Sequence, residues 1–360
     1  MDIGNKNILW LDLFDFLSYN KKRSLLSLFE KDKDIRQEFL KNKVIREILS
    51  KEEFDKMALS LSDAFLDIRL KEYEQKSVKC ITFYDNEYPF LLKEISAPPL
   101  CLYCKGNTQL LQTDCVAVVG TRTPSDYGIV TTKQFTKELA KAGLTIVSGL
   151  ATGVDTIAHT VALEEQANTI AVLAGGLDHI YPASNYNLAR KMLENNLILS
   201  EFPPTTRPLS YYFPLRNRII AGLSKGVLIT EAGEKSGALH TVEYAVNYGR
   251  EVFAIPGKIN APMSRGTNKT IKTCQSSLVM SPSDIFDMLH IEIDKKQKKP
   301  AVQLDINLQI VLDYIKTDKH TFQEILEKTG LSARDLNLIL MELEMAGLIT
   351  KLANNSYIMS

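Results

Sequence analysis

The sequence predicts an α/β protein whose central domain contains a doubly wound parallel sheet. Fourteen of its 18 glycines lie between Gly120 and Gly266, where short apolar runs alternate with segments of helical length. Apolar strands separated by helices are typical of a parallel sheet that is covered on both faces. The chain has 360 residues, and at about 150 residues per domain this length leaves room for two smaller domains.

Residues 1–79 are predicted to form a small helical N-terminal domain. This segment contains a single glycine, Gly4, and its apolar residues recur at helical spacing, as Leu25, Leu28 and Phe29 do.

Residues 80–290 are predicted to form an extended Rossmann-like domain. Its expected strands are 115–120, 145–149, 169–175, 197–202, 226–232, 251–257 and 277–280, and its expected helices lie near 128–142, 153–166, 184–195, 216–224 and 236–248. An earlier strand-like run holds Cys101 and Cys104, which have the spacing of a zinc or redox pair. Because no second pair of ligands lies at a matching distance, we interpret them as packing residues of a buried strand.

The C-terminal part is predicted to be a charged linker, residues 291–303, followed by a winged-helix-like domain, residues 304–360. Helices are expected at 308–315, 321–329 and 332–346, with Thr321 and Ser332 as N-caps and Gly330 as a stop signal. Two short β-rich runs, 347–350 and 356–359, then indicate a hairpin. Three helices and a hairpin in this order are typical of a winged helix.

Charge and composition exclude several classes of protein. Lys+Arg and Asp+Glu both number 43, so any affinity for nucleic acid must come from a local patch. The apolar runs are far shorter than the ~20 residues that cross a bilayer, and the N-terminus has no signal-peptide layout. Five scattered cysteines do not describe a disulfide framework. We therefore expect a cytoplasmic protein without a membrane partner.

The loops that follow the predicted strands are rich in glycine and hydroxyl groups, as at 120–125, 148–155 and 231–237. In an open parallel sheet such loops converge on one edge, where backbone N–H groups and helix N-termini can bind an anion. The dinucleotide and P-loop fingerprints are both absent, which disfavours a nucleotide cofactor held in those ways.

Cations and aromatic rings accompany these loops. Arg122 follows the first strand, Lys235 precedes a Ser-Gly pair, and Arg216 and Arg218 are expected to open a helix just after Phe213. Guanidinium groups match phosphate geometry, and rings among fixed cations are typical of platforms for single-stranded nucleic acid. An alternative remains open, in which the rings anchor the core and the two helix arginines pair with acidic neighbours.

Catalytic patterns are few. Asp155 and His159 have the i, i+4 spacing of a metal site, but we interpret them as a capping aspartate and a buried, hydrogen-bonded histidine. Glu231 and Glu234 follow a strand without a predicted partner. We expect no catalytic residue, cofactor or metal.

Several motifs resemble the DNA processing protein A (DprA/Smf) family. They include Val-Val-Gly-Thr-Arg-Thr-Pro-Ser at 118–125, Val-Ser-Gly-Leu-Ala-Thr-Gly-Val-Asp at 147–155 and Phe-Pro-Leu-Arg-Asn-Arg-Ile-Ile-Ala-Gly at 213–222. The resemblance spans about residues 80–275. It implies a homodimer that binds single-stranded DNA, and double-stranded DNA more weakly. It also implies loading of the RecA recombinase during natural transformation, with no cofactor and no turnover.

Carried over to this sequence, the resemblance implies ten DNA-binding residues: Arg122, Ser148, Gly149, Phe213, Arg216, Asn217, Arg218, Lys235, Ser236 and Gly237. Ala238 stands where the family usually has serine, so a hydroxyl contact is in question there. The N-terminal domain lacks the glycines of a helix-hairpin-helix, and we assign it no DNA contact. The third winged-helix helix carries Asp335, Glu342 and Glu344, so an interaction role is as well founded as DNA reading.

A second function class competes with this interpretation. Nucleoside-phosphate hydrolases of the lysine-decarboxylase-like type resemble the central domain in layout and use glycine-rich loops with a glutamate. Their Pro-Gly-Gly-x-Gly-Thr-x-x-Glu motif is absent, and residues 231–237 occupy the analogous place. The sequence therefore favours the DNA-binding interpretation.

Overall fold

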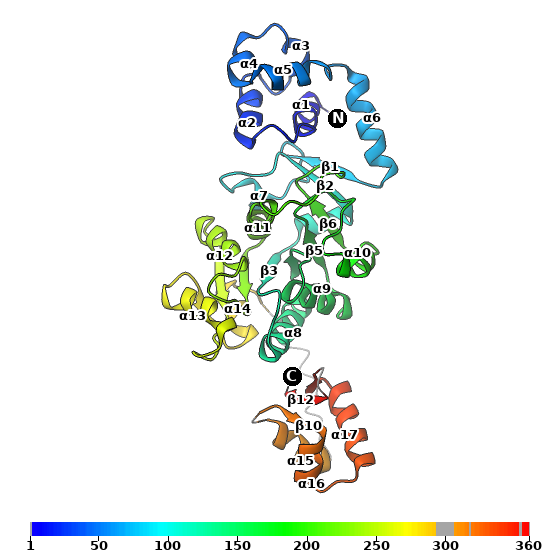
Figure 1. The fold of residues 1–360 in the computed structure, drawn as a ribbon, viewed down its shortest axis with the longest axis vertical. Coiled ribbons are helices and arrows are strands. Elements are labelled where there is room, and N and C mark those ends of the chain that lie inside the picture. Colours follow the sequence, from blue (N-terminus) through cyan, green and yellow to red (C-terminus); the bar gives the residue numbers. More distant parts are fainter. Residues whose placement is uncertain (1, 293–305, 317, 353–354, 360) are drawn as a thin grey trace.

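The computed structural model describes residues 2–292, 306–316, 318–352 and 355–359 (Figure 1). Nearly all of the predicted linker, 291–303, lies outside the described residues. Within the described part of the chain, no helix combines the length and the apolar character that crossing a bilayer requires.

A nine-stranded sheet forms the centre of the molecule, in the order β1-β2-β6-β5-β4-β3-β7-β8-β9. The strands are β1 (Lys79–Thr82), β2 (Cys101–Gly106), β3 (Cys115–Val119), β4 (Thr145–Ser148), β5 (Thr169–Val172), β6 (Leu197–Ser200), β7 (Gly226–Ile229), β8 (Glu251–Ala254) and β9 (Ser277–Leu278). Seven of them pair in parallel, as predicted, while β1 and β2 extend one edge in antiparallel pairing. The strand order reverses at β3, which places the expected ligand crevice beyond its carboxyl end.

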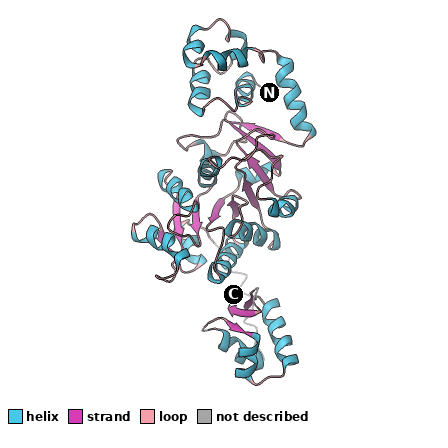
Figure 2. Ribbon diagram, viewed as in Figure 1, coloured by secondary structure: helices cyan, strands magenta, loops and turns pink. Residues whose placement is uncertain are grey.

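Helices cover both faces of this sheet (Figure 2). They include α8 (Asp126–Lys141) and α9 (Val154–Glu164) on one face, and α11 (Tyr212–Leu223) and α12 (Ala238–Asn247) on the other. Alternate residues of β3 supply both cores: Val116 and Val118 pack with α8 and α9, whereas Ala117 and Val119 pack with α11 and α12. The predicted doubly wound fold is therefore confirmed.

Two differences from the predicted elements matter. The six strands β3 to β8 end one to three residues before their predicted ends, because the apolar pattern continues into the loops. Helix α11 begins at Tyr212, four residues before the predicted start, and Pro214 lies inside its first turn. Proline is tolerated there because the first-turn N–H groups have no partner within the helix.

The two cysteines at 101 and 104 are buried in β2 and are not disulfide-bonded, as interpreted from the sequence. Burial raises the pKa of both thiols.

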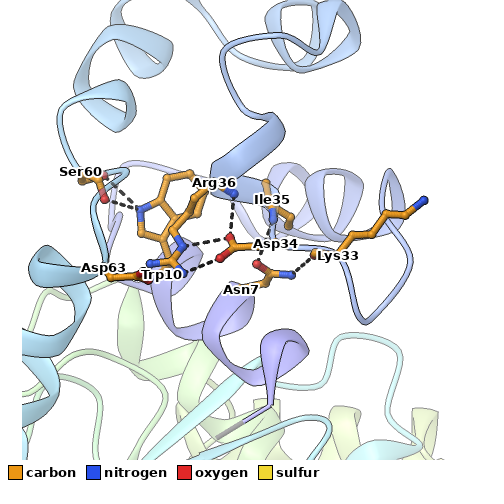
Figure 3. Close-up of polar contacts among 8 residues, drawn as sticks. All are labelled: Asn7, Trp10, Lys33, Asp34, Ile35, Arg36, Ser60 and Asp63. Atoms are coloured by element: carbon orange, nitrogen blue, oxygen red, sulfur yellow. Dashed lines mark hydrogen bonds and ion pairs between the residues drawn. The ribbon is translucent and has the colours of Figure 1, made fainter.

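The N-terminal part is helical, from α1 (Ile3–Asp12) through α2 (Tyr19–Ser27), α3 (Ile35–Glu38), α4 (Lys43–Ile48) and α5 (Lys51–Ala58) to α6 (Asp63–Gln75). Its core surrounds Trp10, whose indole N–H donates to the Ser60 carbonyl at 3.1 Å. A buried Arg36 pairs with Asp34 at 2.6 Å and with Asp63 at 2.8 Å (Figure 3). These contacts fix the helices to one another.

The C-terminal part contains α15 (Ile306–Ile315), α16 (Phe322–Thr329) and α17 (Ala333–Met345), with a small sheet of β10 (His320–Thr321), β11 (Ile349–Lys351) and β12 (Ser356–Met359). Thr321 and Ser332 cap their helices, and Gly330 ends α16 in the left-handed conformation. This arrangement confirms the predicted winged helix.

Candidate nucleic-acid interface

An open cleft of about 760 Å³ lies beyond the carboxyl end of β3. The loops after β3 and β7 and the first turns of α11 and α12 form its walls. Seven of the ten predicted residues line it: Arg122, Phe213, Arg216, Asn217, Lys235, Ser236 and Gly237. Ser148, Gly149 and Arg218 do not line this cleft.

Arg122 and Phe213 face each other inside the cleft. The exposed Arg122 guanidinium lies over the half-buried Phe213 ring, with its Cζ atom 5.5 Å from the ring centroid. The edge of Tyr181 meets the same ring at a centroid distance of 5.6 Å and an interplanar angle of 70°. The cleft therefore presents an aromatic surface with an exposed cation directly over it.

The helical periodicity of α11 decides which of its residues reach the cleft. Phe213, Arg216 and Asn217 are three and four residues apart, so they share one helix face. Arg218 is two residues beyond Arg216 and therefore points about 200° away. It is buried in an ion pair with Glu201, which contradicts the prediction that it meets phosphates in the cleft.

Arg216 lies on the cleft floor and is only 5% exposed. Its Nη1 donates to the carbonyls of Gly149, at 2.7 Å, and Val172. Burial lowers the pKa of this guanidinium to about 10, so it remains charged at neutral pH. Arg216 is thus a fixed charge on the cleft floor, and the prediction from the resemblance that it lies near phosphates stays a prediction.

Gly149 and Ser148 have structural contacts of their own. A Cβ atom at Gly149 would overlap the Arg216 guanidinium, so glycine is required there for close approach. The fully buried Ser148 donates its hydroxyl to the Val118 carbonyl at 2.8 Å. Both residues thus have roles inside the protein, and the DNA contacts that the resemblance implies for them stay predictions.

Several backbone donors of the glycine-rich loops are also engaged within the protein. The N–H groups of Gly149 and Ala151 donate to the Asp155 carboxylate at 3.1 and 3.3 Å. The Thr121 N–H donates to the Glu231 carbonyl at 2.7 Å. Some of the backbone N–H groups that were expected to bind an anion therefore already donate to other groups of the protein. The exposed Arg122 and Lys235 side chains provide the accessible positive charge.

Asn217 links Arg216, on the cleft floor, to the loop that carries Lys235. Its amide oxygen accepts from Arg216 Nε at 3.1 Å, and its amide nitrogen donates to the Gly237 carbonyl at 3.2 Å. Ala238, which follows at the start of α12, lines the cleft without a hydroxyl group. The side chains of this wall are thus held in place by a short chain of hydrogen bonds.

The pair Asp155 and His159 is not arranged as a metal site. His159 is fully buried, its Nδ1 lies 2.7 Å from the Thr169 hydroxyl, and burial lowers its pKa to about 3. This confirms the interpretation of a hydrogen-bonded core histidine, while Asp155 binds loop N–H groups instead of capping its own helix. Among the described residues, no group of three or more potential ligands gathers.

The glutamate that follows β7 is likewise a structural residue. Glu231 is buried, and its carboxylate accepts from the Ser125 N–H at 2.8 Å and from the Ser125 hydroxyl at 2.7 Å. A Cβ at Gly128 would contact the same carboxylate, which explains the glycine in the first turn of α8. The competing hydrolase interpretation would need a glutamate free to act on a ligand in the cleft. Glu231 is engaged by Ser125, and the exposed Glu234 lies 3.9 Å from Lys269 and is not among the residues that line the cleft.

The cleft is also lined by residues that were not among the ten predicted, including Thr121, Tyr181, Ser210, His240, Thr241 and Met263. Tyr181 follows a strand-end loop and could have been proposed as a second ring from that position alone. Ser210 and Met263 lie outside the predicted strand-end loops, and the motifs named above do not contain them.

Comparisons with known proteins agree with this fold. The family model for DNA recombination-mediator protein A matches residues 79–290, and the model for the DprA winged helix domain matches residues 295–355. The Bacillus subtilis DNA processing protein DprA is 42% identical over 221 residues, which cover 61% of this chain and 74% of that protein. Protein Smf of Synechocystis is 33% identical over 320 residues, covering 78% and 80% of the two chains.

Two solved structures are also similar. The X-ray structure of DNA processing protein A from Streptococcus pneumoniae has a TM-score of 0.70 and 35% identity, covering 81% of this chain and all of that one. DNA processing protein A from Helicobacter pylori, whose structure concerns its single-stranded DNA binding mode, has a TM-score of 0.54 and 35% identity over 59% of this chain and 95% of that one. Because family models match both its central domain and its winged helix, the chain belongs to the DNA recombination-mediator protein A (DprA/Smf) family.

Proposed function

We propose that this protein binds single-stranded DNA in the cleft beyond β3. Phe213 would stack on a base while Arg122 and Lys235 contact phosphates. The observation that carries the proposal is the exposed Arg122 guanidinium lying 5.5 Å over a half-buried ring in an open cleft. A base that stacks on this ring displaces the guanidinium from the ring face toward the backbone phosphates.

The buried Arg216 supports the same assignment. Its charge is held by two backbone carbonyls, so it cannot leave the floor, and it makes the cleft attractive to an anionic strand. The formal net charge of the chain is zero, so this local cluster must supply the electrostatic part of binding. A duplex cannot present an unstacked base to Phe213, and we therefore propose weaker binding of double-stranded DNA.

The test is a titration with fluorescent single- and double-stranded oligonucleotides at two salt concentrations. Single strands should bind more tightly, and their affinity should fall as salt rises. Lys235→Ala should weaken binding, whereas Lys225→Ala, at the opposite end of β7, should not. Equal affinity for duplex, or equal loss in both lysine variants, would contradict the proposal.

We further propose that the bound strand is delivered to a RecA-type recombinase in the cytoplasm, and that the protein acts as a homodimer without catalytic turnover. The support is membership of the family. Recombinase ATPase activity on single strands coated with a binding protein should rise when this protein is added. Light scattering should give a dimer, and a monomer at tens of micromolar would contradict that part. Release of free base from nucleoside monophosphates would contradict the absence of turnover.

A further inference from the structure

Helix α17 of the winged helix carries an exposed apolar stripe. Leu338, Met341 and Met345 are 59%, 63% and 84% exposed, and they recur at intervals of three and four residues. Side chains at these intervals lie along one face of a helix. The opposite face packs into the domain core through Leu336, Ile339, Leu340 and Leu343.

The flanks of this stripe are acidic. At 100° per residue, Asp335 and Glu342 lie along one side of the stripe and Glu344 along the other. The one basic residue of α17, Arg334, lies in line with the stripe, one turn before Leu338. Residues 306–359 contain seven acidic and five basic side chains. A helix that enters a DNA groove needs cations toward the phosphates, and this face has the opposite charge.

A second copy of the chain is also a poor occupant. Two α17 faces laid together would bring acidic flanks against acidic flanks, and like charges that meet across an interface disfavour it. A complementary surface instead has an apolar centre and basic flanks. Methionine side chains are flexible and polarizable, so a stripe with two of them can adapt to such a partner.

We propose that the outer face of α17 binds a basic amphipathic helix of a protein partner. The apolar side of that helix would cover Leu338, Met341 and Met345, and its lysines or arginines would lie against Glu342 and Glu344. One helix covers a small area, so the interaction is expected to be weak and transient. Its affinity should fall with rising salt, because the flanking charges are exposed.

The probe is a fluorescein-labelled synthetic helix of about 18 residues, or five turns, with leucines along one face and lysines on both flanks. Controls are a scrambled peptide of the same composition and a version with glutamate in place of lysine. The full-length protein should bind the basic amphipathic peptide about tenfold or more tightly than either control.

Two surface variants test the location. The double variant Met341→Ser/Met345→Ser should weaken binding of the basic peptide about tenfold or more, and Glu342→Lys/Glu344→Lys should do the same and reduce the salt dependence. The matched control is Leu59→Ser, because Leu59 is 87% exposed in the N-terminal domain. Since all these positions are exposed, thermal melting should be unchanged and single-stranded DNA binding in the cleft should persist.

Four outcomes would overturn the proposal: unchanged peptide affinity in Met341→Ser/Met345→Ser, equal affinity for the glutamate peptide, a dimer that the methionine variant converts to monomer, or loss of duplex binding in that variant. The third would assign the face to a second copy and the fourth to DNA. None of them bears on the cleft, because Phe213 and Lys235 remain intact in every variant.

Discussion

Replacing Phe213 with alanine distinguishes two possible roles of its ring, which are binding a ligand and anchoring the core. The ring is half-buried, and it contacts the edge of Tyr181 and the Arg122 guanidinium. An aromatic pair contributes about 0.5–1.5 kcal/mol beyond its buried area. We therefore expect Phe213→Ala to lower the free energy of unfolding by less than about 2 kcal/mol, compared with about 3–5 kcal/mol for a core phenylalanine.

Binding should respond more strongly than folding. Stacking of one base on an aromatic ring contributes about 1–3 kcal/mol, which corresponds to roughly a five- to 150-fold loss of single-strand affinity in Phe213→Ala. Phe213→Trp keeps a stacking surface, so it should bind at least as tightly as the wild type. Phe90→Ala is the matched control, because this phenylalanine is 71% exposed on α7 (Phe90–Lys93), outside the cleft.

The assays are a denaturation curve and a fluorescence binding isotherm on the same preparations. The reasoning is refuted if Phe213→Ala costs about 3–5 kcal/mol of stability while its folded fraction binds DNA like the wild type. A tryptophan variant that destabilises the fold would point the same way, because a core site rejects added volume.

Three further predictions concern other residues. Arg122→Ala should weaken binding of all single-strand sequences. In a salt titration, it should lower the slope of log affinity against log salt by about 0.7, which corresponds to one phosphate contact. An unchanged slope would mean that the arginine has a structural role. Gly149→Ala should cost about 1–3 kcal/mol of stability by thermal melting because of the Arg216 guanidinium, whereas Gly237→Ala, with open space around it, should not. Burial lowers the pKa of His159 from 6.5 to about 3, so the unfolded chain binds a proton first and stability should fall as pH drops from about 6.5 toward 3. Comparing unfolding curves of wild type and His159→Gln isolates that contribution, because other titrating groups cancel in the difference.

The sheet and its helices could be predicted because their signals are local. Runs such as those of β3 and β4 are apolar throughout, as strands covered on both faces must be, and the glycine-rich loops mark where each strand ends. The antiparallel β2 pairs with β6, which lies about 90 residues further along the chain. Nothing in the composition of either strand specifies that partner, so the pairing could not be read from local patterns.

Glycine-rich loops mislead because glycine has two uses that look alike in sequence. An anion nest needs glycine so that N–H groups can converge, whereas a crowded loop needs it because a Cβ has no room. At Gly149 the second reason holds, since the Arg216 guanidinium fills the space. The guanidinium comes from a helix 67 residues away, so the reason for the glycine is a tertiary contact that the motif does not contain.

The two arginines of α11 show where sequence reasoning could have gone further. Once residues 216–224 are taken as helical, Arg216 and Arg218 must diverge by about 200°, whatever the helix start. Only one of them can face a given ligand, and the other must find a partner in the opposite direction, as Arg218 does in Glu201. The choice between them follows from Phe213, because a residue three positions before Arg216 shares its face. Two cations at i and i+2 on a helix therefore predict one side chain directed toward the cleft and one directed away from it, not a double clamp on phosphate.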